Sequence, residues 1–509
     1  MNDSTHQNKE NSKNSTILMV LTLVSRLLGI VRARVITTAF GATSTADVIN
    51  VAYYLPNNLR KIFAEGAITS AFIPSFTKDD SKTYRNKLLS LMLSAQLILF
   101  SIIILIFVFF GRQIFSFISD FEGSELVLGG KLLPYFIGFL AFISIANVFA
   151  AALQTDKHFI AYGIAPLFFS IIVIIFVSIF HKKLDAMSMA YGVLLGSIIQ
   201  FIFTFICVYK RGYRVKASLQ FNDNEFKKVL KTWLIVVGSA IATILSQQYS
   251  TYLASTLATG NATAFSNSMI FFSTPYGIVN AGFVTVIYPL LSKSYIQKDV
   301  KQFHSDLEYG IEGMINLFIP ATILLMFLNK EFVAVLLQNG KFTFEDTQLT
   351  ASVIFYLVLG LTIIGLNSLL NRTLIAKDKA KLSFILIVMQ AIIDVILSYT
   401  LIQKLGIIAL PIANTISFLI TLIIHFYVLK NDINFNHLFT TLFKTFIANL
   451  PLIIVLIGYK RIFTSWYISG STFINLIYLI VLCLILGILT IISYSVFKIP
   501  FIQYFKRKK

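Results

Sequence analysis

Long apolar stretches separated by short polar segments make up most of this chain. Each stretch runs on for roughly 20 residues, the length that an α-helix needs to cross about 30 Å of hydrocarbon. The pattern predicts fourteen membrane-spanning helices, at 16–40, 45–77, 86–110, 130–153, 158–180, 186–209, 231–256, 264–292, 309–329, 348–371, 382–402, 406–429, 443–459 and 471–497. A shorter apolar stretch at 112–118 is expected to be an interfacial turn.

Composition supports an all-α polytopic membrane protein. The 509 residues are 57% hydrophobic, with a mean hydropathy of +0.80. Residues 1–15 are polar and are expected to be disordered; they lack the layout of a cleaved signal peptide, so the first span should be retained. Cys207 and Cys483 both lie in apolar stretches, where cysteine packs as a small hydrophobe, so no disulfide or metal framework is expected.

The distribution of charge predicts the orientation. Most of the 42 Lys and Arg residues lie in loops that face the cytoplasm if both termini are inside, as the positive-inside rule requires. The sequence therefore predicts a multi-pass protein of the cytoplasmic (inner) membrane, N-in and C-in. Basic loops of this kind contact anionic lipid headgroups, and we expect no nucleic-acid partner.

The chain also contains an internal repeat. Residues 63–78 align without gaps to 278–293, which pairs Pro74 with Pro289 and Lys78 with Lys293. Six spans per repeat is an even number, so the two halves should enter the membrane in the same direction, as two parallel six-helix lobes. In transporters the binding site lies between such halves.

These features predict the domain organisation. Six segments are expected: a disordered cytoplasmic N-terminus (1–15), an N-terminal six-helix lobe (16–209), a basic cytoplasmic linker (210–230), a C-terminal six-helix lobe (231–429), helices 13 and 14 (430–497), and a basic cytoplasmic tail (498–509).

The first two spans carry most of the intramembrane charge. They contain Arg26, Arg32, Arg34, Asp47, Arg60, Lys61 and Glu65. A charged side chain near the bilayer centre costs about 2.5–3.5 kcal/mol on insertion scales, so an excess of cations there calls for a reason. We expect the cations to line a wet cavity that receives an anionic group.

Arginine suits a phosphate or pyrophosphate group, because its planar fork binds bidentately and keeps its proton. Arg26 and Arg60 fall near the midplane and have no obvious acidic partner in the sequence. Gly29 and Pro56 are candidate hinges that would bend the two helices, and Asn57 follows Pro56 directly.

A structural reading accounts for much of the remaining charge, at Arg34, Lys61 and Glu65. Asp47 could pair with Arg32 or Arg34 near the outer end and form a gate, and Lys61 could pair with Glu65 at i, i+4 spacing.

A second candidate site lies in the C-terminal half. Asp394 stands in an apolar span one turn after Gln390, and Asn414 and Thr415 lie in the next span. An isolated carboxylate at this depth is protonated, paired or an ion ligand. Coupling to Na⁺, to H⁺ or to the membrane potential is therefore a hypothesis; no other cofactor is expected.

Three stretches resemble the MurJ/MviN family of lipid II flippases, within the multidrug, oligosaccharide-lipid and polysaccharide exporters. They are SRLLGIVRARVI (25–36), FGATSTADVINVAYYLPNNLRKIFAEGAITSAFIPSF (40–76) and NGKFT (339–343). The resemblance implies alternating access by two lobes around a cationic cavity, with a groove for a prenyl tail at helices 13 and 14. The implied substrate is undecaprenyl-pyrophosphate-linked disaccharide-pentapeptide (lipid II), moved from the inner to the outer leaflet for peptidoglycan synthesis.

By motif position the resemblance assigns substrate binding to Arg26, Arg32 and Arg60, and an outer gate to Asp47. This chain departs from the family at Ala33, where many members have an acidic residue. It also departs at 268–275, SMIFFSTP, which lacks an Arg and a Glu found in some members.

Other readings remain. A membrane phosphosugar transferase would need clustered aspartates for Mg²⁺, which no predicted span supplies, so an enzyme is not expected. An exporter of another polysaccharide-lipid or of drugs on the same fold is the alternative transporter. A non-transporting scaffold would tolerate loss of Arg26 and Arg60.

Overall fold

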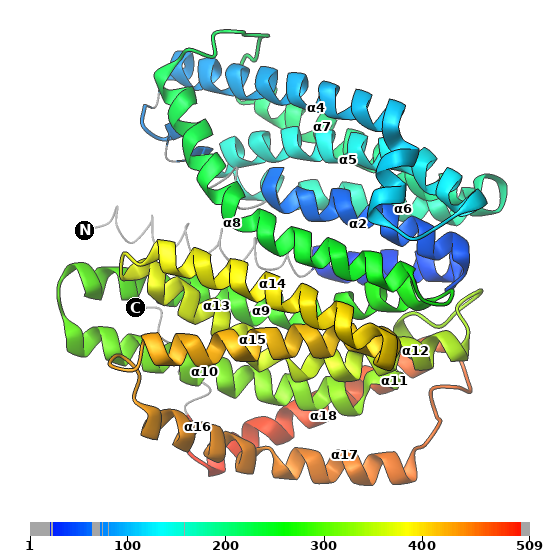
Figure 1. Ribbon diagram of the computed structural model, residues 1–509, viewed down its shortest axis with the longest axis vertical. Coiled ribbons are helices and arrows are strands. Elements are labelled where there is room, and N and C mark those ends of the chain that lie inside the picture. The colour runs from blue at the N-terminus through cyan, green and yellow to red at the C-terminus, as the bar shows by residue number, and fades with distance from the viewer. Residues whose placement is uncertain are drawn as a thin grey trace. The chain divides into compact units, whose positions relative to one another are not determined.

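In a computed structural model of the chain, every regular element among the described residues is a helix (Figure 1). The structure describes residues 24–63, 75–79, 81–156 and 158–499, together with residues 21 and 72–73. The predicted disordered N-terminus and most of the predicted basic tail lie outside these residues. The all-α prediction is confirmed for the described part of the chain.

The chain divides into two compact units. Unit 1 comprises the chain up to Thr263 together with Asn339–Phe342, and unit 2 comprises Ala264–Gln338 and Thr343 onward. Unit 1 contains a helix at 24–40, α2 (Ser44–Phe63), α4 (Lys82–Ile118), α5 (Gly123–Thr155), α6 (Phe159–Leu184), α7 (Ala186–Lys210) and α8 (Asn224–Ser255).

Unit 2 is built from eleven further described elements, the first of which begins in unit 1. They are α9 (Asn261–Ile296), α10 (Val300–Phe327), α11 (Asn329–Leu336), α12 (Phe344–Leu359), α13 (Leu361–Ala376), α14 (Ala380–Leu405), the 3₁₀ turn η1 (Gly406–Ile408), α15 (Ala409–Val428), α16 (Phe435–Ala448), α17 (Leu450–Ile462) and α18 (Thr472–Val496).

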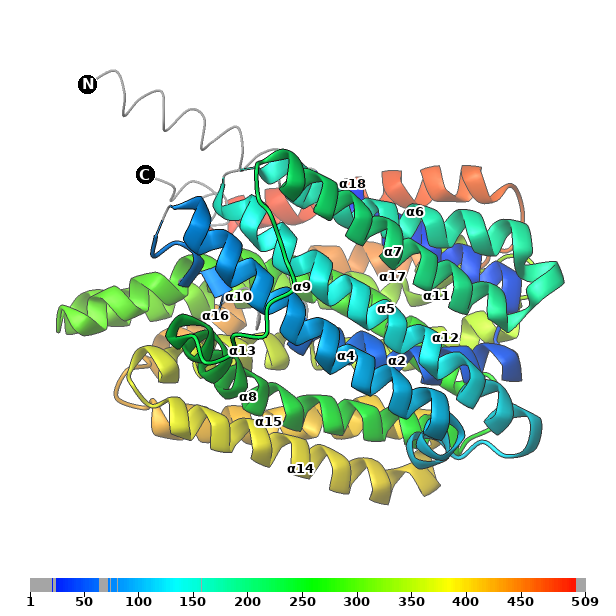
Figure 2. The same cartoon turned by 90° about the horizontal axis from the view of Figure 1, so that it is seen from above.

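The same packing pattern occurs inside each unit. In unit 1, α5 packs against α4 and α7, and α6 packs against α7. In unit 2, α13 packs against α10 and α15, and α14 packs against α15; α14 and α15 lie side by side in both views (Figures 1 and 2). Tight turns at Asp185 and Gly406, each with positive φ, join the α6–α7 and α14–α15 pairs. These shared features agree with the internal repeat in the sequence.

Among the described residues, eight helical stretches are long and apolar enough to cross a membrane, or nine if one bent pair counts as a single span. The bent pair is α12 and α13, which meet at 43°. One of the eight is the stretch 380–428, which holds both α14 and α15. The count of fourteen spans stays a prediction.

The expectation of an interfacial turn at 112–118 is wrong, because α4 stays helical to Ile118. The cause is close packing against α5. A Cβ added at Gly111 would lie 2.7 Å from the carbonyl oxygen of Gly130, so glycine lets the two backbones approach. Phe115, which follows Gly111 by one turn, is fully buried in the same contact with Gly129.

The position of α8 differs from the predicted domain boundaries. The sequence analysis assigned residues 231–256 to the second lobe, but α8 packs against α2 and α4 and belongs to unit 1. The indole nitrogen of Trp233 donates to the carbonyl oxygen of Ile62 at 3.1 Å. The wider division into two lobes of six helices stays a prediction.

Unit 2 contains an ion pair between a fully buried carboxylate and a lysine that is 32% exposed, outside its main apolar core. The carboxylate of Glu331 in α11 is fully buried and bonds to the ammonium of Lys460 in α17. Around it pack Phe332, Tyr459 and Tyr467. Removing one partner of a buried ion pair leaves an uncompensated charge, which costs more than the pair itself contributes.

We predict that Lys460→Met destabilises the protein by about 3 kcal/mol, because it strands the Glu331 carboxylate. The melting temperature in detergent should fall clearly. Glu331→Gln added to the same variant should restore most of the loss. Lys330→Met, which removes an exposed neighbouring lysine, is the matched control and should change little. Equal losses in the two lysine variants would contradict the prediction.

Candidate functional site

Two of the predicted arginines, Arg32 and Arg60, influence each other electrostatically in unit 1. Arg32, on the helix at 24–40, lies within electrostatic reach of Arg60 and Tyr53 of α2. Its guanidinium sits 5.0 Å from the ring centre of Phe169, and its Nη1 is 3.4 Å from the Ser170 hydroxyl. The aromatic face and the hydroxyl orient the guanidinium without neutralising its charge. The arrangement can attract and bind an anionic group.

The other candidate residues of these two helices are half-buried. Arg26 and Arg34 lie on the helix at 24–40, and Asn57 lies on α2. The helix at 24–40 runs through Gly29, and α2 runs through Pro56, without a break in either assignment. The hinge role of these two residues stays a prediction.

The C-terminal end of α2 is fixed by side chains from other helices. The carbonyl oxygens at a helix end have no partner within the helix. The Ile62 carbonyl accepts from Trp233 of α8, and the Phe63 carbonyl accepts from the hydroxyl of Ser144 in α5 at 2.6 Å. Gln96 of α4 donates to the same hydroxyl at 3.0 Å. Arg60, two and three residues before these carbonyls, is therefore carried on a helix end that three neighbouring side chains hold.

Asp47 holds the other end of α2. Its Oδ1 accepts from the backbone N–H of Thr263 at 2.7 Å and from the Thr263 hydroxyl at 2.6 Å. Its Oδ2 accepts from the backbone N–H of Gly260 at 2.6 Å. Asn50, one turn on, donates to the Thr263 hydroxyl at 3.1 Å. A buried carboxylate of α2 thus caps the N-terminus of α9, where partial positive charge favours an anion.

The structure does not show the ion pair that the sequence suggested for Asp47. Its hydrogen-bond donors among the described residues are Gly260 and Thr263, not Arg32 or Arg34. Arg32 instead faces Phe169 and Ser170. The reason is that backbone N–H groups at a helix start satisfy a carboxylate without burying a second charge.

Beside this cap, the NGKF segment at 339–342 interlocks with the end of the first helix. The Lys341 N–H donates to the Thr38 carbonyl at 3.2 Å. Gly41 and Gly340 both have positive φ. A Cβ at Gly41 would lie 2.5 Å from the Lys341 oxygen, and one at Gly340 would lie 2.5 Å from the Thr38 oxygen. Glycine is therefore required at both positions.

The candidate ion site of the second half is buried in unit 2. Asp394 is 2% exposed and shares one face of α14 with Gln390, whose amide donates to Ser417 of α15 at 3.0 Å. The Asn414 carbonyl also accepts from Ser417. Thr415 lies against Gly360. No group of three or more His, Cys, Asp or Glu side chains that could hold a metal occurs among the residues that the structure describes.

Some predictions cannot be followed in the structure. Glu65 lies outside the described residues, and the side chain of Lys61 is not described. Their proposed pairing therefore stays a prediction.

Sequence reasoning missed several residues that position the site. Phe169 and Ser170 lie in an apolar stretch with nothing to distinguish them, and Trp233 looked like part of a span. Gly260 and Thr263 gave a weak signal, because they lie in the polar turn ATGNAT (258–263) between two spans.

Comparison with known proteins gives one consistent result. Residues 36–483 match the profile of the family described as "Lipid II flippase MurJ". A probable lipid II flippase MurJ of Borreliella burgdorferi is 30% identical over 488 residues, which cover 95% of this chain and 96% of that protein. One from Rickettsia prowazekii is 27% identical, covering 80% of this chain and 81% of that protein.

Solved structures show the same fold. A lipid II flippase MurJ in an inward closed conformation matches with a TM-score of 0.76 at 22% identity, covering 97% of this chain and all of that one. An inward-facing multidrug resistance MATE family transporter of the MOP superfamily matches with a TM-score of 0.65 at 16% identity, covering 81% and 96%. The chain is thus a multi-pass membrane protein that belongs to the lipid II flippase MurJ family, a family of transporters and not of enzymes, as the sequence predicted.

Proposed function

We propose that this protein flips lipid II from the inner to the outer leaflet of the cytoplasmic membrane by alternating access, with both termini inside. The observation that carries the proposal is that Arg32 and Arg60, on consecutive helices of unit 1, lie within electrostatic range of each other. Two cations within electrostatic range repel each other at low dielectric. A pyrophosphate between them would offset that repulsion and accept bidentate hydrogen bonds from both.

Arg26 and Asn57 would add to the same headgroup site, since they lie on the same two helices. The prenyl tail would lie along α16, α17 and α18, which carry many exposed large apolar side chains such as Phe443, Ile454 and Ile488. The acyl chains of the bilayer and an isoprenoid chain are both apolar hydrocarbon, so either can cover such a surface.

Depletion of the protein in cells tests the proposal directly. Lipid II should accumulate on the cytoplasmic side of the membrane. Accumulation of a different polyprenyl-linked saccharide, or sensitisation to cationic drugs without lipid II accumulation, would favour the alternative exporter.

The cap formed by Asp47 suggests how the carrier without substrate is kept in the inward-facing state. Its three donors come from the turn between α8 and α9 and the start of α9. We infer that this cap forms the outer gate and stabilises the inward-facing state. A ligand shifts the equilibrium between the inward-facing and outward-facing states only if it binds the two with different affinity. If a mutation weakens the gate, a lower substrate concentration should be enough to open the carrier outward.

Coupling to an ion would use Asp394 with Gln390, Asn414 and Thr415. The support is burial of the carboxylate on the packed face of α14 against α15. Na⁺, H⁺ and the membrane potential remain alternatives as the driving force.

We predict that Arg26→Ala and Arg60→Ala each lower lipid II flipping at least about thirtyfold, since losing a charged hydrogen bond to a buried anion costs about 2 kcal/mol or more. Both variants should reach the membrane in normal amounts. Arg34→Ala is the matched control and should support growth. Growth supported by Arg26→Ala or Arg60→Ala at normal expression would refute the arginine assignment.

We predict that Asp47→Asn shifts the population toward the outward-open state. The amide keeps one acceptor oxygen but turns an NH₂ group toward backbone N–H donors. Cysteine labelling from outside at Thr38 and Asn50, in a background lacking Cys207 and Cys483, should rise several-fold. Both positions are half-buried against the 339–342 segment or Thr263. Unchanged or lower labelling would leave Asp47 as a folding residue only.

We predict that Asp394→Asn removes any dependence of flipping on Na⁺ or pH, because the variant can neither bind a cation by charge nor release a proton. Flipping by reconstituted protein is measured across Na⁺ concentration and pH. Gln390→Glu, which adds a carboxylate one turn away, should keep an ion dependence. An unchanged dependence in Asp394→Asn would make the carboxylate structural.

A further inference from the structure

Unit 2 contains a buried histidine whose ring lies between two carbonyl oxygens. His425 is in the last turn of α15 and is fully buried. Its Nδ1 lies 2.8 Å from the backbone oxygen of Thr421, one turn earlier, and its Nε2 lies 3.3 Å from Oδ1 of Asn371 in α13. The hydroxyl of Ser383 in α14 donates to the same Oδ1 at 2.9 Å. These contacts join α13, α14 and α15, which pack against one another in pairs.

This pair of oxygens suits the charged form of the ring. A neutral imidazole carries one N–H and can donate to only one oxygen, whereas the imidazolium donates from both nitrogens. The charged ring would therefore satisfy both oxygens, and Oδ1 of Asn371 would accept from His425 and from Ser383 through its two lone pairs. The last turn of α15 adds to this effect, because the carbonyl groups at a helix C-terminus favour a cation.

The neutral ring fits the same place after one change at Asn371. If the amide of Asn371 is turned end for end about its Cβ–Cγ bond, its Nδ2 donates to Nε2 of His425 and to the hydroxyl oxygen of Ser383. The Nδ1–H of the ring meanwhile keeps its bond to the backbone oxygen of Thr421. Both protonation states thus have a partner at each ring nitrogen.

The amide of Asn371 can turn because only its oxygen is engaged: for its Nδ2, no acceptor is found in the described part of the chain. Asn367, one turn earlier on α13, is fixed instead. Its Nδ2 donates to the backbone oxygens of Ile363 at 3.0 Å and Phe418 at 2.8 Å, and its Oδ1 accepts from the hydroxyl of Thr421 at 3.1 Å. The change between the two states is therefore confined to the Asn371 side of the ring.

The groups that face the ring are neutral: the Thr421 carbonyl from α15, the Asn371 amide from α13 and the Ser383 hydroxyl from α14. On α14, Asp394 lies eleven residues beyond Ser383, about 16 Å along the helix axis. α12, which also packs against α15, carries its carboxylates in its first turn, at Glu345 and Asp346.

The charged side chains near the ends of α13 and α15 and the start of α14 have other surroundings. Arg372 lies over the ring of Tyr288, and Lys377 pairs with Asp432. The remaining ones are exposed: Asp378, Lys379, Lys381 and Lys430. An ionisable side chain buried in a membrane helix is costly, and its presence there points to a function.

We propose that His425 is a reversible proton-binding site inside unit 2. A proton added to the lone pair of Nε2 is held by the Asn371 oxygen, and its release leaves a neutral Nδ1–H ring to which the turned Asn371 amide donates. The proton comes from water and returns to it, and the N–H bond at Nε2 is the only covalent bond made or broken. The site goes beyond the proposed function and does not rest on it, because it is built from contacts within unit 2.

Nitrogen-15 NMR of the histidine rings tests the site in the full-length protein in lipid nanodiscs. The shifts of the two ring nitrogens distinguish the imidazolium from each neutral tautomer. The chain has six histidines, and the signals of His425 are those lost in His425→Gln. As the pH is lowered from about 8, His425 should change from the Nδ1–H tautomer to the doubly protonated ring. A ring that stays in one state until the protein unfolds, or a neutral ring with its proton on Nε2, would overturn the proposal.

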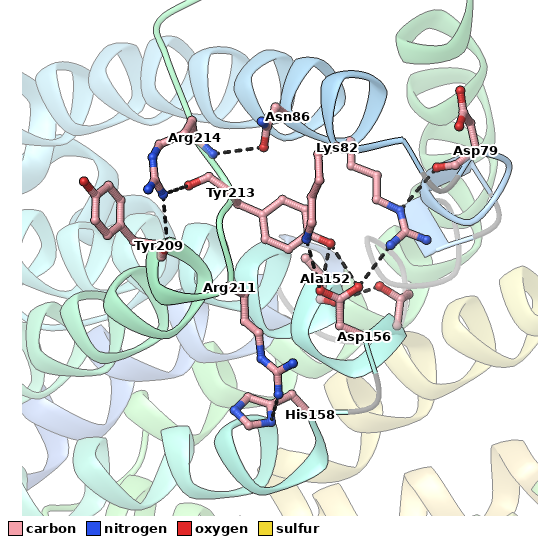
Figure 3. A network of polar contacts seen from close by, with 12 residues as sticks. Asp79, Lys82, Asn86, Ala152, Asp156, His158, Tyr209, Arg211, Tyr213 and Arg214 are labelled. Atoms are coloured by element: carbon pink, nitrogen blue, oxygen red, sulfur yellow. Dashed lines mark hydrogen bonds and ion pairs between the residues drawn. The ribbon is translucent and has the colours of Figure 1, made fainter. Parts of the chain in front are cut away.

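Two other histidines are internal comparisons. Nδ1 of His158 accepts from Arg211 at 2.8 Å (Figure 3), so the neutral ring of His158 should carry its proton on Nε2. Nδ1 of His181 lies 3.0 Å from a backbone oxygen one turn earlier, as in His425, but for its Nε2 no partner is found among the described residues. His181 should therefore share the neutral tautomer of His425 and should not respond to changes at Asn371.

Variants of Asn371 test the contact that differs between the two states. Asn371→Asp keeps Oδ1 and adds a negative charge, so His425 should stay doubly protonated throughout the titration. Asn371→Leu offers neither an oxygen nor an N–H, so the ring should stay neutral. Asn436→Asp, an exposed change on α16, is the matched control and should leave the titration of His425 as in the wild type. The same titration of His425 in all three variants would overturn the role of Asn371 and with it the proposal.

Discussion

The first unit depends on how the two ends of α2 are satisfied. A helix leaves backbone groups without partners at each end, and inside a membrane water cannot supply them. At the start of α2 the Thr43 hydroxyl accepts from the Ala46 N–H at 3.4 Å, and the Asp47 carboxylate accepts from amides at the start of α9. At the other, Trp233 and Ser144 cap the last carbonyls. Because Arg60 rides on this helix, the polar caps also place the cation that the proposed function needs.

The charged side chains Asp47 and Arg32 near α2 contact neutral groups. The Asp47 carboxylate accepts from two backbone N–H groups and a hydroxyl, and Arg32 contacts a ring and a hydroxyl, so the described contacts of both are with neutral groups. An ion pair between Asp47 and Arg32 would have compensated both charges. It would also have occupied the guanidinium, which could then not bind an anionic ligand. Separate neutral partners leave the Arg32 guanidinium charged and hold the Asp47 carboxylate in place.

Backbone contacts also fix segments of unit 1 to one another elsewhere. The glycines Gly41 and Gly340 interlock two turns so closely that neither tolerates a side chain. The backbone N–H groups of Arg214, Lys216 and Ser218 donate to side chains of α4. Both contacts join segments far apart in the sequence, so neither could be read from local patterns.

The sequence by itself determined the helical membrane fold, the internal repeat, the family and the arginines of the first two spans. These follow from apolar length and charge burial, which are properties of single segments. Only the tertiary structure decided that Asp47 bonds to Gly260 and Thr263, and that α8 belongs with α2. The choice among partners depends on which groups lie within hydrogen-bonding distance, and residues 47 and 263 meet only after the helices between them have packed.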